Sequence, residues 1–98
     1  MKRVIEEIIR FRNDRGWEHS DNPENLAKSI IIEAAELLEN YQWGADHADL
    51  ENVKEEIADV VIYAIAMAYD LGFDMEKIIL EKLEKNAIKY PRKKWLAF

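Results

Sequence analysis

The chain has 98 residues, 49% of them hydrophobic and 35% charged, with three glycines, two prolines, no cysteine and a net charge of −6. This composition leaves little room for the turns of an all-β fold and predicts a single all-α domain over residues 1–98. The missing cysteines exclude disulfides, cysteine-ligated zinc and a thiol nucleophile, and so acidic a chain is a poor match for a nucleic-acid duplex.

The first two predicted helices are separated by a short polar loop. Residues 2–15 place an apolar side chain at every third or fourth position, and Gly16 ends this helix. After the loop of residues 17–21, Asn22 and Pro23 are typical of a helix cap and first turn. This second helix is expected to run to Gly44. Its core stripe is expected to be Leu26, Ile30, Leu37 and Tyr41.

Two further helices follow, each with an acidic residue before it. Asp46 or Asp49 can cap the third, which should end at Gly72, and Asp74 can cap the fourth, which Pro91 terminates. The expected core stripe of the third is Val53, Ile57, Val60, Ala64 and Leu71, with Glu56 and Asp59 on its flank. The expected inward side chains of the fourth are Met75, Ile78, Ile79, Leu83 and Ala87.

The third helix contains an uncharged run from Val60 to Tyr69 that is apolar around its whole circumference. Such a helix must be covered on every side, which three neighbours of ordinary length in one chain can barely do. We therefore expect a four-helix bundle-like domain completed by homo-oligomerisation, as a homodimer or homotetramer. The alternative is a monomeric four-helix bundle with this helix at its centre.

Two pairs of carboxylates lie in apolar surroundings on the second and third helices. Glu33 precedes Glu36 by three residues, and Glu56 precedes Asp59 by three, so each pair projects side by side from its helix. Four such groups in one space of low dielectric constant would repel each other strongly, and a divalent metal would relieve this. The alternative is that the pairs are surface carboxylates at the edge of a core.

Charge is distributed unevenly along the chain. Residues 1–80 carry a net charge of −10, whereas residues 81–98 carry +4. An acidic body that holds metal and a basic tail suit a small polyphosphate, bound by metal on one side and by lysine and arginine on the other. Arg92, Lys93 and Lys94 can equally be a solvated tail.

The order of these motifs resembles the signature of the all-α nucleoside triphosphate pyrophosphohydrolases, the MazG-like superfamily. Nineteen residues separate Glu36 from Glu56. The segments that match the pattern are Asn25-Leu26, Glu33-Ala-Ala-Glu36-Leu-Leu-Glu39, Tyr41-Gln42-Trp43, Glu56-Ile-Ala-Asp59-Val, Leu71-Gly72-Phe73-Asp74, Lys85-Asn86 and Lys89-Tyr90-Pro91. The resemblance implies Mg²⁺-dependent cleavage of a nucleoside triphosphate to monophosphate and pyrophosphate by helical dimers or tetramers, with nucleotide-pool cleansing as one role.

Residue roles follow from the matching positions. Glu33, Glu36, Glu56 and Asp59 are the expected ligands of Mg²⁺, for which Mn²⁺ can substitute, and Glu36 or Glu39 is the expected proton acceptor. The resemblance makes Lys85, Asn86, Lys89 and Tyr90 the phosphate and sugar contacts. Trp43 is similar to a base-stacking position of the dCTP-handling branch, and Trp17 is a second candidate.

His19 and His47 are expected at the surface, and Trp95 in packing across a subunit boundary. No stretch is long enough to span a membrane, and we expect a soluble, cytoplasmic protein. A di-iron bundle would need Glu-x-x-His motifs, which this chain lacks. Two alternatives stay open: a non-catalytic helical adaptor of the same fold, and a dUTP-type or phosphoribosyl-ATP-type pyrophosphohydrolase.

Overall fold

A computed structural model of the chain describes residues 1–92, so Lys93, Lys94 and Trp95 lie outside the described residues. The all-α prediction is confirmed, because these residues form helices and contain no strand. The elements are α1 (Lys2–Asp14), the 3₁₀ turn η1 (Trp17–His19), α2 (Pro23–Glu39), the 3₁₀ turn η2 (Ala45–His47), α3 (Leu50–Asp70) and α4 (Met75–Lys89). Within residues 1–92, no helix has the length and apolar character that crossing a membrane requires.

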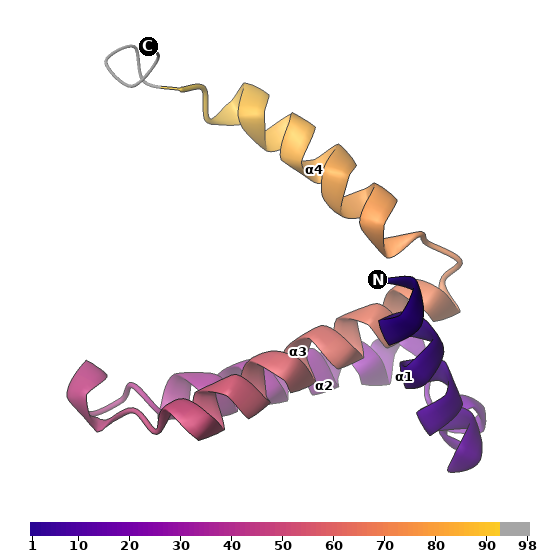
Figure 1. Cartoon of the computed structure of the whole chain (residues 1–98), viewed down its shortest axis with the longest axis horizontal. Coiled ribbons are helices and arrows are strands. Elements are labelled where there is room, and N and C mark those ends of the chain that lie inside the picture. Colours follow the sequence, from indigo (N-terminus) through magenta and orange to yellow (C-terminus); the bar gives the residue numbers. More distant parts are fainter. Residues whose placement is uncertain (93–98) are drawn as a thin grey trace.

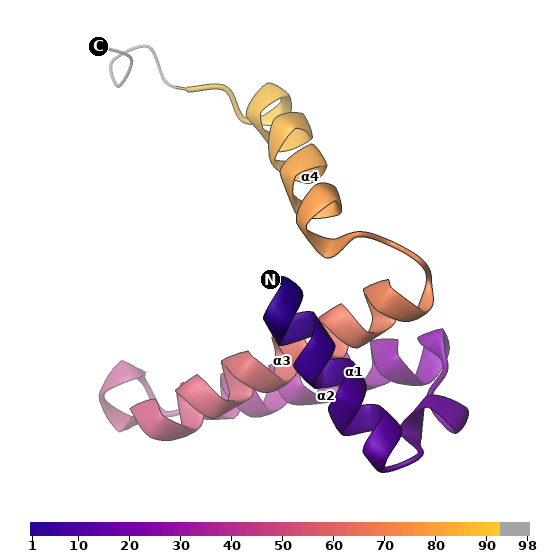
Figure 2. The ribbon, with the colours of Figure 1, turned by 45° about the vertical axis from the view of Figure 1, so that its right-hand side comes forward.

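Helices α2 and α3 form an antiparallel hairpin that is the centre of the fold (Figure 1). α1 crosses the end of this hairpin opposite η2 and packs on α3, as Figure 2 also shows. The core lies at this crossing, where α1, α2 and α3 meet. Its buried apolar side chains are Ile8, Leu26, Ile65 and Ala66.

The helix ends follow local signals in the sequence. Asn22 Oδ1 accepts a hydrogen bond from Asn25 N at 2.8 Å, and Asp49 and Asp74 cap α3 and α4 in the same way. Gly16 after α1 and Gly72 after α3 have φ values of 68° and 77°, which favour glycine. The predicted ends of α1, α3 and α4 are therefore confirmed to within two residues.

The predicted end of α2 at Gly44 is wrong, because the helix stops at Glu39. The Asn40 side chain donates hydrogen bonds to the carbonyl oxygens of Glu36 and Leu37, and its Nδ2 donates to Asn52 Oδ1 of α3 at 2.8 Å. An asparagine side chain that bonds backbone carbonyls competes with helical hydrogen bonds. The turn at Asn40 ties the end of α2 to the first turns of α3.

The predicted rotation of α3 about its axis is also wrong in one respect. Ile57, assigned to the core stripe, is 50% exposed, whereas Glu56, assigned to its flank, is only 9% exposed. The helix turns Glu56 toward α2 and leaves Ile57 outside. Because the run from Val60 to Tyr69 in α3 is apolar on all sides, the hydrophobic pattern of that run does not define which side of the helix faces α2.

A buried arginine connects three parts of the chain. Arg12 of α1 is 5% exposed, and its two terminal nitrogens bind the Asp70 carboxylate at the end of α3 at 3.0 and 2.7 Å. Arg12 Nε also donates to Asp21 Oδ2 at 3.1 Å, in the connection before α2. The hydrogen bonds and charges of Asp70 and Asp21 raise the pKa of Arg12 above its usual value. The guanidinium thus fixes the loop between α1 and α2 against α3.

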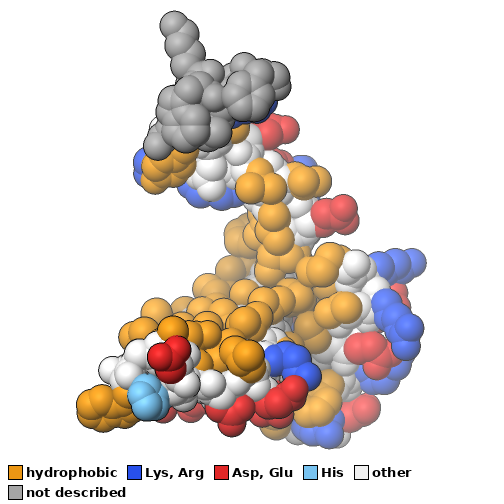
Figure 3. Space-filling model, turned by 60° about the vertical axis from the view of Figure 1, so that its left-hand side comes forward, with side chains coloured by type: hydrophobic (Ala, Val, Ile, Leu, Met, Phe, Trp, Pro, Cys, Tyr) orange, Lys and Arg blue, Asp and Glu red, His pale blue; other side chains and the backbone are white. Residues whose placement is uncertain are grey.

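α4 projects away from the other helices and does not close a bundle within one chain (Figure 1). Of the helices described, only α3 is in close contact with it, and none of its residues is buried. The expectation that Ile79 and Leu83 face inward is therefore wrong for the single chain, since they are 47% and 57% exposed. Figure 3 shows hydrophobic side chains gathered on a face that runs from the hairpin to α4.

Candidate active site

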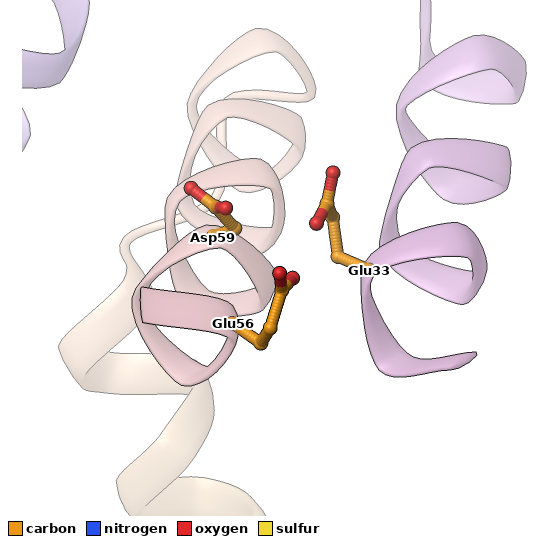
Figure 4. A group of neighbouring side chains, drawn as sticks. All are labelled: Glu33, Glu56 and Asp59. Atoms are coloured by element: carbon orange, nitrogen blue, oxygen red, sulfur yellow. The ribbon is translucent and has the colours of Figure 1, made fainter. Parts of the chain in front are cut away.

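Three carboxylates converge between α2 and α3. Glu33 of α2 faces Glu56 and Asp59 of α3 across the space between the two helices, as Figure 4 shows. One oxygen from each group lies within 4.8 Å of the others. We call these three side chains the acidic trio. Glu33 lies at a position of α2 where the core stripe calls for an apolar residue, and Glu56 and Asp59 occupy successive turns of α3.

The electrostatics of the trio are unfavourable without a cation. The adjoining Glu56 carboxyl, burial, and the negative charges of Glu36 and Asp59 raise the pKa of Glu33 to about 7. Glu33 Oε2 and Glu56 Oε2 are buried and have no hydrogen-bond partner among the described residues. A buried carboxylate oxygen without a donor is costly, so these two atoms call for a proton, a water molecule or a metal ion.

The donor set of the trio fits a hard divalent cation. All three groups offer carboxylate oxygens, which Mg²⁺ and Mn²⁺ prefer, and neither histidine belongs to the group. A few carboxylates leave part of an octahedral shell for water and phosphate oxygens. Among the described residues, this is the place where the chain could hold such an ion.

Glu36 and Glu39 are placed differently from the trio. Glu36 is exposed and outside it, although its carboxylate is close enough to Glu33 to raise the pKa of that group. Glu39 is the last residue of α2 and is also exposed, six residues from Glu33 and therefore on another side of the helix. The structure brings three of the four predicted ligands together, with the fourth beside them.

A groove of about 710 Å³ runs between α1 and α3 and reaches Asp59. Its lining is mostly apolar, and Trp17 stands in its wall. The Trp17 ring makes an edge-to-face contact with the Phe11 ring, with centroids 5.6 Å apart. The Arg15 guanidinium stacks on the Phe11 ring, with its Cζ 3.4 Å from the ring centroid. The groove thus combines an aromatic wall with a carboxylate of the acidic trio at one end.

Tyr63 also lines the groove, one turn of α3 beyond Asp59. Burial and the negative charges of Glu33 and Asp59 raise the pKa of its phenol. The hydroxyl therefore keeps its proton at neutral pH and can donate a hydrogen bond to a ligand oxygen.

The remaining predicted substrate contacts do not line this groove in the single chain. Trp43 is 76% exposed in the turn between α2 and η2. The four candidates on or next to α4 lie on the helix that projects from the hairpin: Lys85, Asn86, Lys89 and Tyr90. Their roles stay predictions.

Three features of the site were missed by sequence reasoning, and the two histidines fall where expected. Arg12, Asp21 and Tyr63 line the groove, but nothing in the local sequence marks Arg12 and Asp21, because they are paired with residues far away along the chain. The Tyr63 position one turn after Asp59 was an available signal. His19 and His47 are exposed, as expected.

Comparison with known proteins identifies the family. The MazG-like family profile matches residues 28–96. The chain belongs to the MazG-like family. Its fold is similar to the crystal structure of a pyrophosphatase from Archaeoglobus fulgidus DSM 4304, with a TM-score of 0.85 and 38% sequence identity, over 94% of this chain and 93% of that one.

Curated relatives of this MazG-like chain include two mammalian enzymes of one name. It is 30% identical over 101 residues to dCTP pyrophosphatase 1 of Rattus norvegicus and 31% identical to that of Homo sapiens, over 90% of this chain and 59% of each relative. The chain thus spans about three-fifths of the length of these relatives. The resemblance stated from the motifs is confirmed at the level of the family.

Proposed function

We propose that this chain is a Mg²⁺-dependent nucleoside triphosphate pyrophosphohydrolase that converts a (d)NTP and water to the (d)NMP and pyrophosphate. The observation that carries the proposal is the acidic trio, in which two buried carboxylate oxygens lack a partner beside an aromatic-walled groove. The names of the relatives, pyrophosphatase and dCTP pyrophosphatase, support the same activity.

The groove suggests how the substrate lies. Asp59 belongs both to the trio and to the groove lining, so the triphosphate is placed at that end. The nucleoside then extends along the apolar lining toward Trp17, whose ring can stack on a base. Tyr63, between these two ends, donates its hydroxyl hydrogen to a sugar or phosphate oxygen.

The residues of the chain divide the chemistry among them. Glu33, Glu56 and Asp59 would hold the metal, which at such a site would neutralise charge on the triphosphate and lower the pKa of water. A water oxygen forms a bond to the α-phosphorus, the bond from that phosphorus to the bridging oxygen breaks, and pyrophosphate leaves. Glu36, exposed beside the trio, accepts the proton of the attacking water.

A second copy of the chain completes the site in this proposal. The apolar side chains exposed on α3 and α4 form a surface that a homodimer or homotetramer would bury: Ile57, Val61, Ile79, Leu80, Leu83 and Ile88. α4 of one protomer then lies against the hairpin of its partner. That packing would bring the basic residues Lys85 and Lys89 to phosphates in the partner's groove.

The test is a panel of canonical and modified nucleotides, incubated with Mg²⁺ or Mn²⁺ and separated by product chromatography. We expect at least one (d)NTP, with dCTP tested first, to give monophosphate and pyrophosphate rather than orthophosphate. Glu56→Gln should reduce kcat/KM by roughly 10³-fold, because it removes a ligand charge from the trio.

The matched control is Glu55→Gln, which changes an exposed glutamate next to Glu56 on α3. It should retain activity within about twofold, because surface charges away from the site contribute little. If wild type, Glu55→Gln and Glu56→Gln are equally inert across the panel while all three bind the same protein partner, the chain is an adaptor of this fold.

A further inference from the structure

Asp21 lies in the wall of the groove next to the proposed base-stacking residue. Its backbone N–H donates to the Trp17 carbonyl oxygen at 2.8 Å, so the two residues belong to one turn. Both side chains line the groove, at positions that lie outside the acidic trio. A base that stacks on Trp17 would therefore share the wall of the groove with the Asp21 carboxylate.

The Asp21 carboxylate is held in place through one of its two oxygens. Arg12 Nε donates to Oδ2 at 3.1 Å, and the two terminal nitrogens of Arg12 are engaged by Asp70. Oδ1 has no hydrogen-bond partner among residues 1–92, although the side chain is only 24% exposed. The site thus presents a fixed acceptor oxygen that is still available to a ligand.

Arg12 does not remove the negative character of this wall. One guanidinium is shared by two carboxylates, those of Asp21 and Asp70, so the group as a whole carries one negative charge. An ionised carboxylate can only accept hydrogen bonds. A ligand group that donates an N–H is therefore favoured at Oδ1, and one that presents a carbonyl oxygen is repelled.

We infer that Asp21 is a specificity-determining residue that selects nucleotides whose base carries an exocyclic amino group. Cytosine, adenine and guanine offer an amino N–H at their polar edge, whereas the ring N–H of uracil and thymine is flanked by two carbonyl oxygens. The inference rests on the proposed function for the position of the base. Arg12 is then a positioning residue, because it orients Asp21 and all three of its side-chain nitrogens are engaged by Asp21 and Asp70.

The sharpest test compares dCTP with dUTP, which differ at the base edge and are otherwise alike. Wild type should prefer dCTP in kcat/KM by about 10- to 100-fold, the range expected when a hydrogen bond to a charged group is replaced by a repulsive contact. Asp21→Asn should reduce this preference to within about threefold, because an amide can also donate to the uracil carbonyl. The change should lie mainly in KM.

Asp70→Asn is the matched control. This change removes the negative charge of Asp70, which binds the same Arg12 from the end of α3. It leaves the Asp21 carboxylate in the wall of the groove. We expect this variant to keep the preference for dCTP within about threefold of wild type. If Asp21→Asn and Asp70→Asn abolish the preference equally, Asp21 acts only by holding the loop, and the inference is overturned.

The outcomes separate the inference from the proposed function. Hydrolysis of dCTP and dUTP at equal rates by wild type refutes the role of Asp21 while the pyrophosphohydrolase stands. If no nucleotide is hydrolysed, the proposed function fails, and equilibrium dialysis of both nucleotides with Mg²⁺ decides the inference. A binding preference for dCTP that Asp21→Asn removes then supports it, and equal binding of the two overturns it.

Discussion

The α2–α3 hairpin and α4 are both amphipathic helical regions, but they satisfy their apolar surface differently. The hairpin packs its two helices against each other and against α1, and it brings the acidic trio together within one chain. α4 has a capped first turn and a full helical length, yet no residue of it is buried. Local signals therefore suffice to form a helix, whereas its packing depends on what covers it.

The two regions therefore carry different parts of the proposed site. The α2–α3 hairpin of one chain assembles the part of the proposed site that would bind metal. The basic residues expected to contact the phosphates lie on α4, which projects away from the hairpin of the same chain. If both halves act on one substrate, they come from different protomers. The first two experiments below test this arrangement and the third tests the hairpin by itself, from the largest expected effect to the smallest.

Mixing two inactive variants tests whether the halves come from different chains. Glu56→Gln disables the hairpin half, and the double variant Lys85→Ala with Lys89→Ala disables the α4 half. Each alone should show less than about 1% of wild-type activity. After subunit exchange in an equal mixture, about one quarter of the sites should be intact, because half of the dimers are mixed and each has one wild-type site.

The opposite arrangement makes a different prediction for the same mixture. If each site takes both halves from one chain, every site carries one defect and the mixture stays inactive. Exchange should be verified by mass spectrometry of the mixed dimer. A control mixture of Glu56→Gln with Glu33→Gln, both in the hairpin half, should stay inactive in either case.

Leu83→Glu tests whether the apolar side of α4 is covered by another copy. Leu83 is 57% exposed in the single chain, and a glutamate there would be buried unpaired in an interface. We expect the dissociation constant of the oligomer to rise by about 30-fold or more, measured by light scattering coupled to size-exclusion chromatography. Glu81→Ala, on the same helix, should leave the mass unchanged. A monomeric wild type would contradict the assembly.

Glu33 gives the smallest predicted effect, a pH dependence of stability in the metal-free protein. Its pKa rises from 4.5 to about 7 on folding, so between these values the folded state binds more protons than the unfolded state. The contribution of Glu33 to stability therefore falls as pH rises through this window. Glu33→Gln should be more stable than wild type by roughly 1–2 kcal/mol at pH 7.5, with little difference at pH 4.5.

Urea unfolding at both pH values measures this difference, and added metal provides the second reading. Mg²⁺ should raise the stability of wild type at pH 7.5 and have less effect on Glu33→Gln, because a ligand that binds the folded state stabilises it. Equal pH dependence in the two proteins would show that folding does not raise the pKa of Glu33.

What the sequence predicts well here is local. Caps at Asn22, Asp49 and Asp74 and stops at Gly16 and Gly72 act through bonds within a few residues, so helix bounds can be inferred without knowing the packing. The side-by-side placement of Glu56 and Asp59 was predictable as well, since residues three apart share a side of any helix. These inferences require no knowledge of the partner element.

What the sequence predicts poorly depends on distant contacts. Ile57 was predicted in the core and is exposed, whereas Glu56 was predicted on the flank and is buried. This difference follows from the rotation of α3 about its axis relative to α2, which the apolar run of α3 does not specify. The partners of Arg12 lie 9 and 58 positions away, beyond any local pattern. The direction of α4 belongs to the same group, because no surface of its own chain fixes it.

In the proposed oligomer, the exposed α4 makes the protein sensitive to its own concentration. A helix that has no fully buried residue on its own chain would be covered only by association, so dilution below the dissociation constant of that oligomer should leave residues 75–89 open to proteases while the hairpin resists them. Total activity in the cell would then rise more steeply than the concentration of the protein, because each protomer would contribute half of each of two sites.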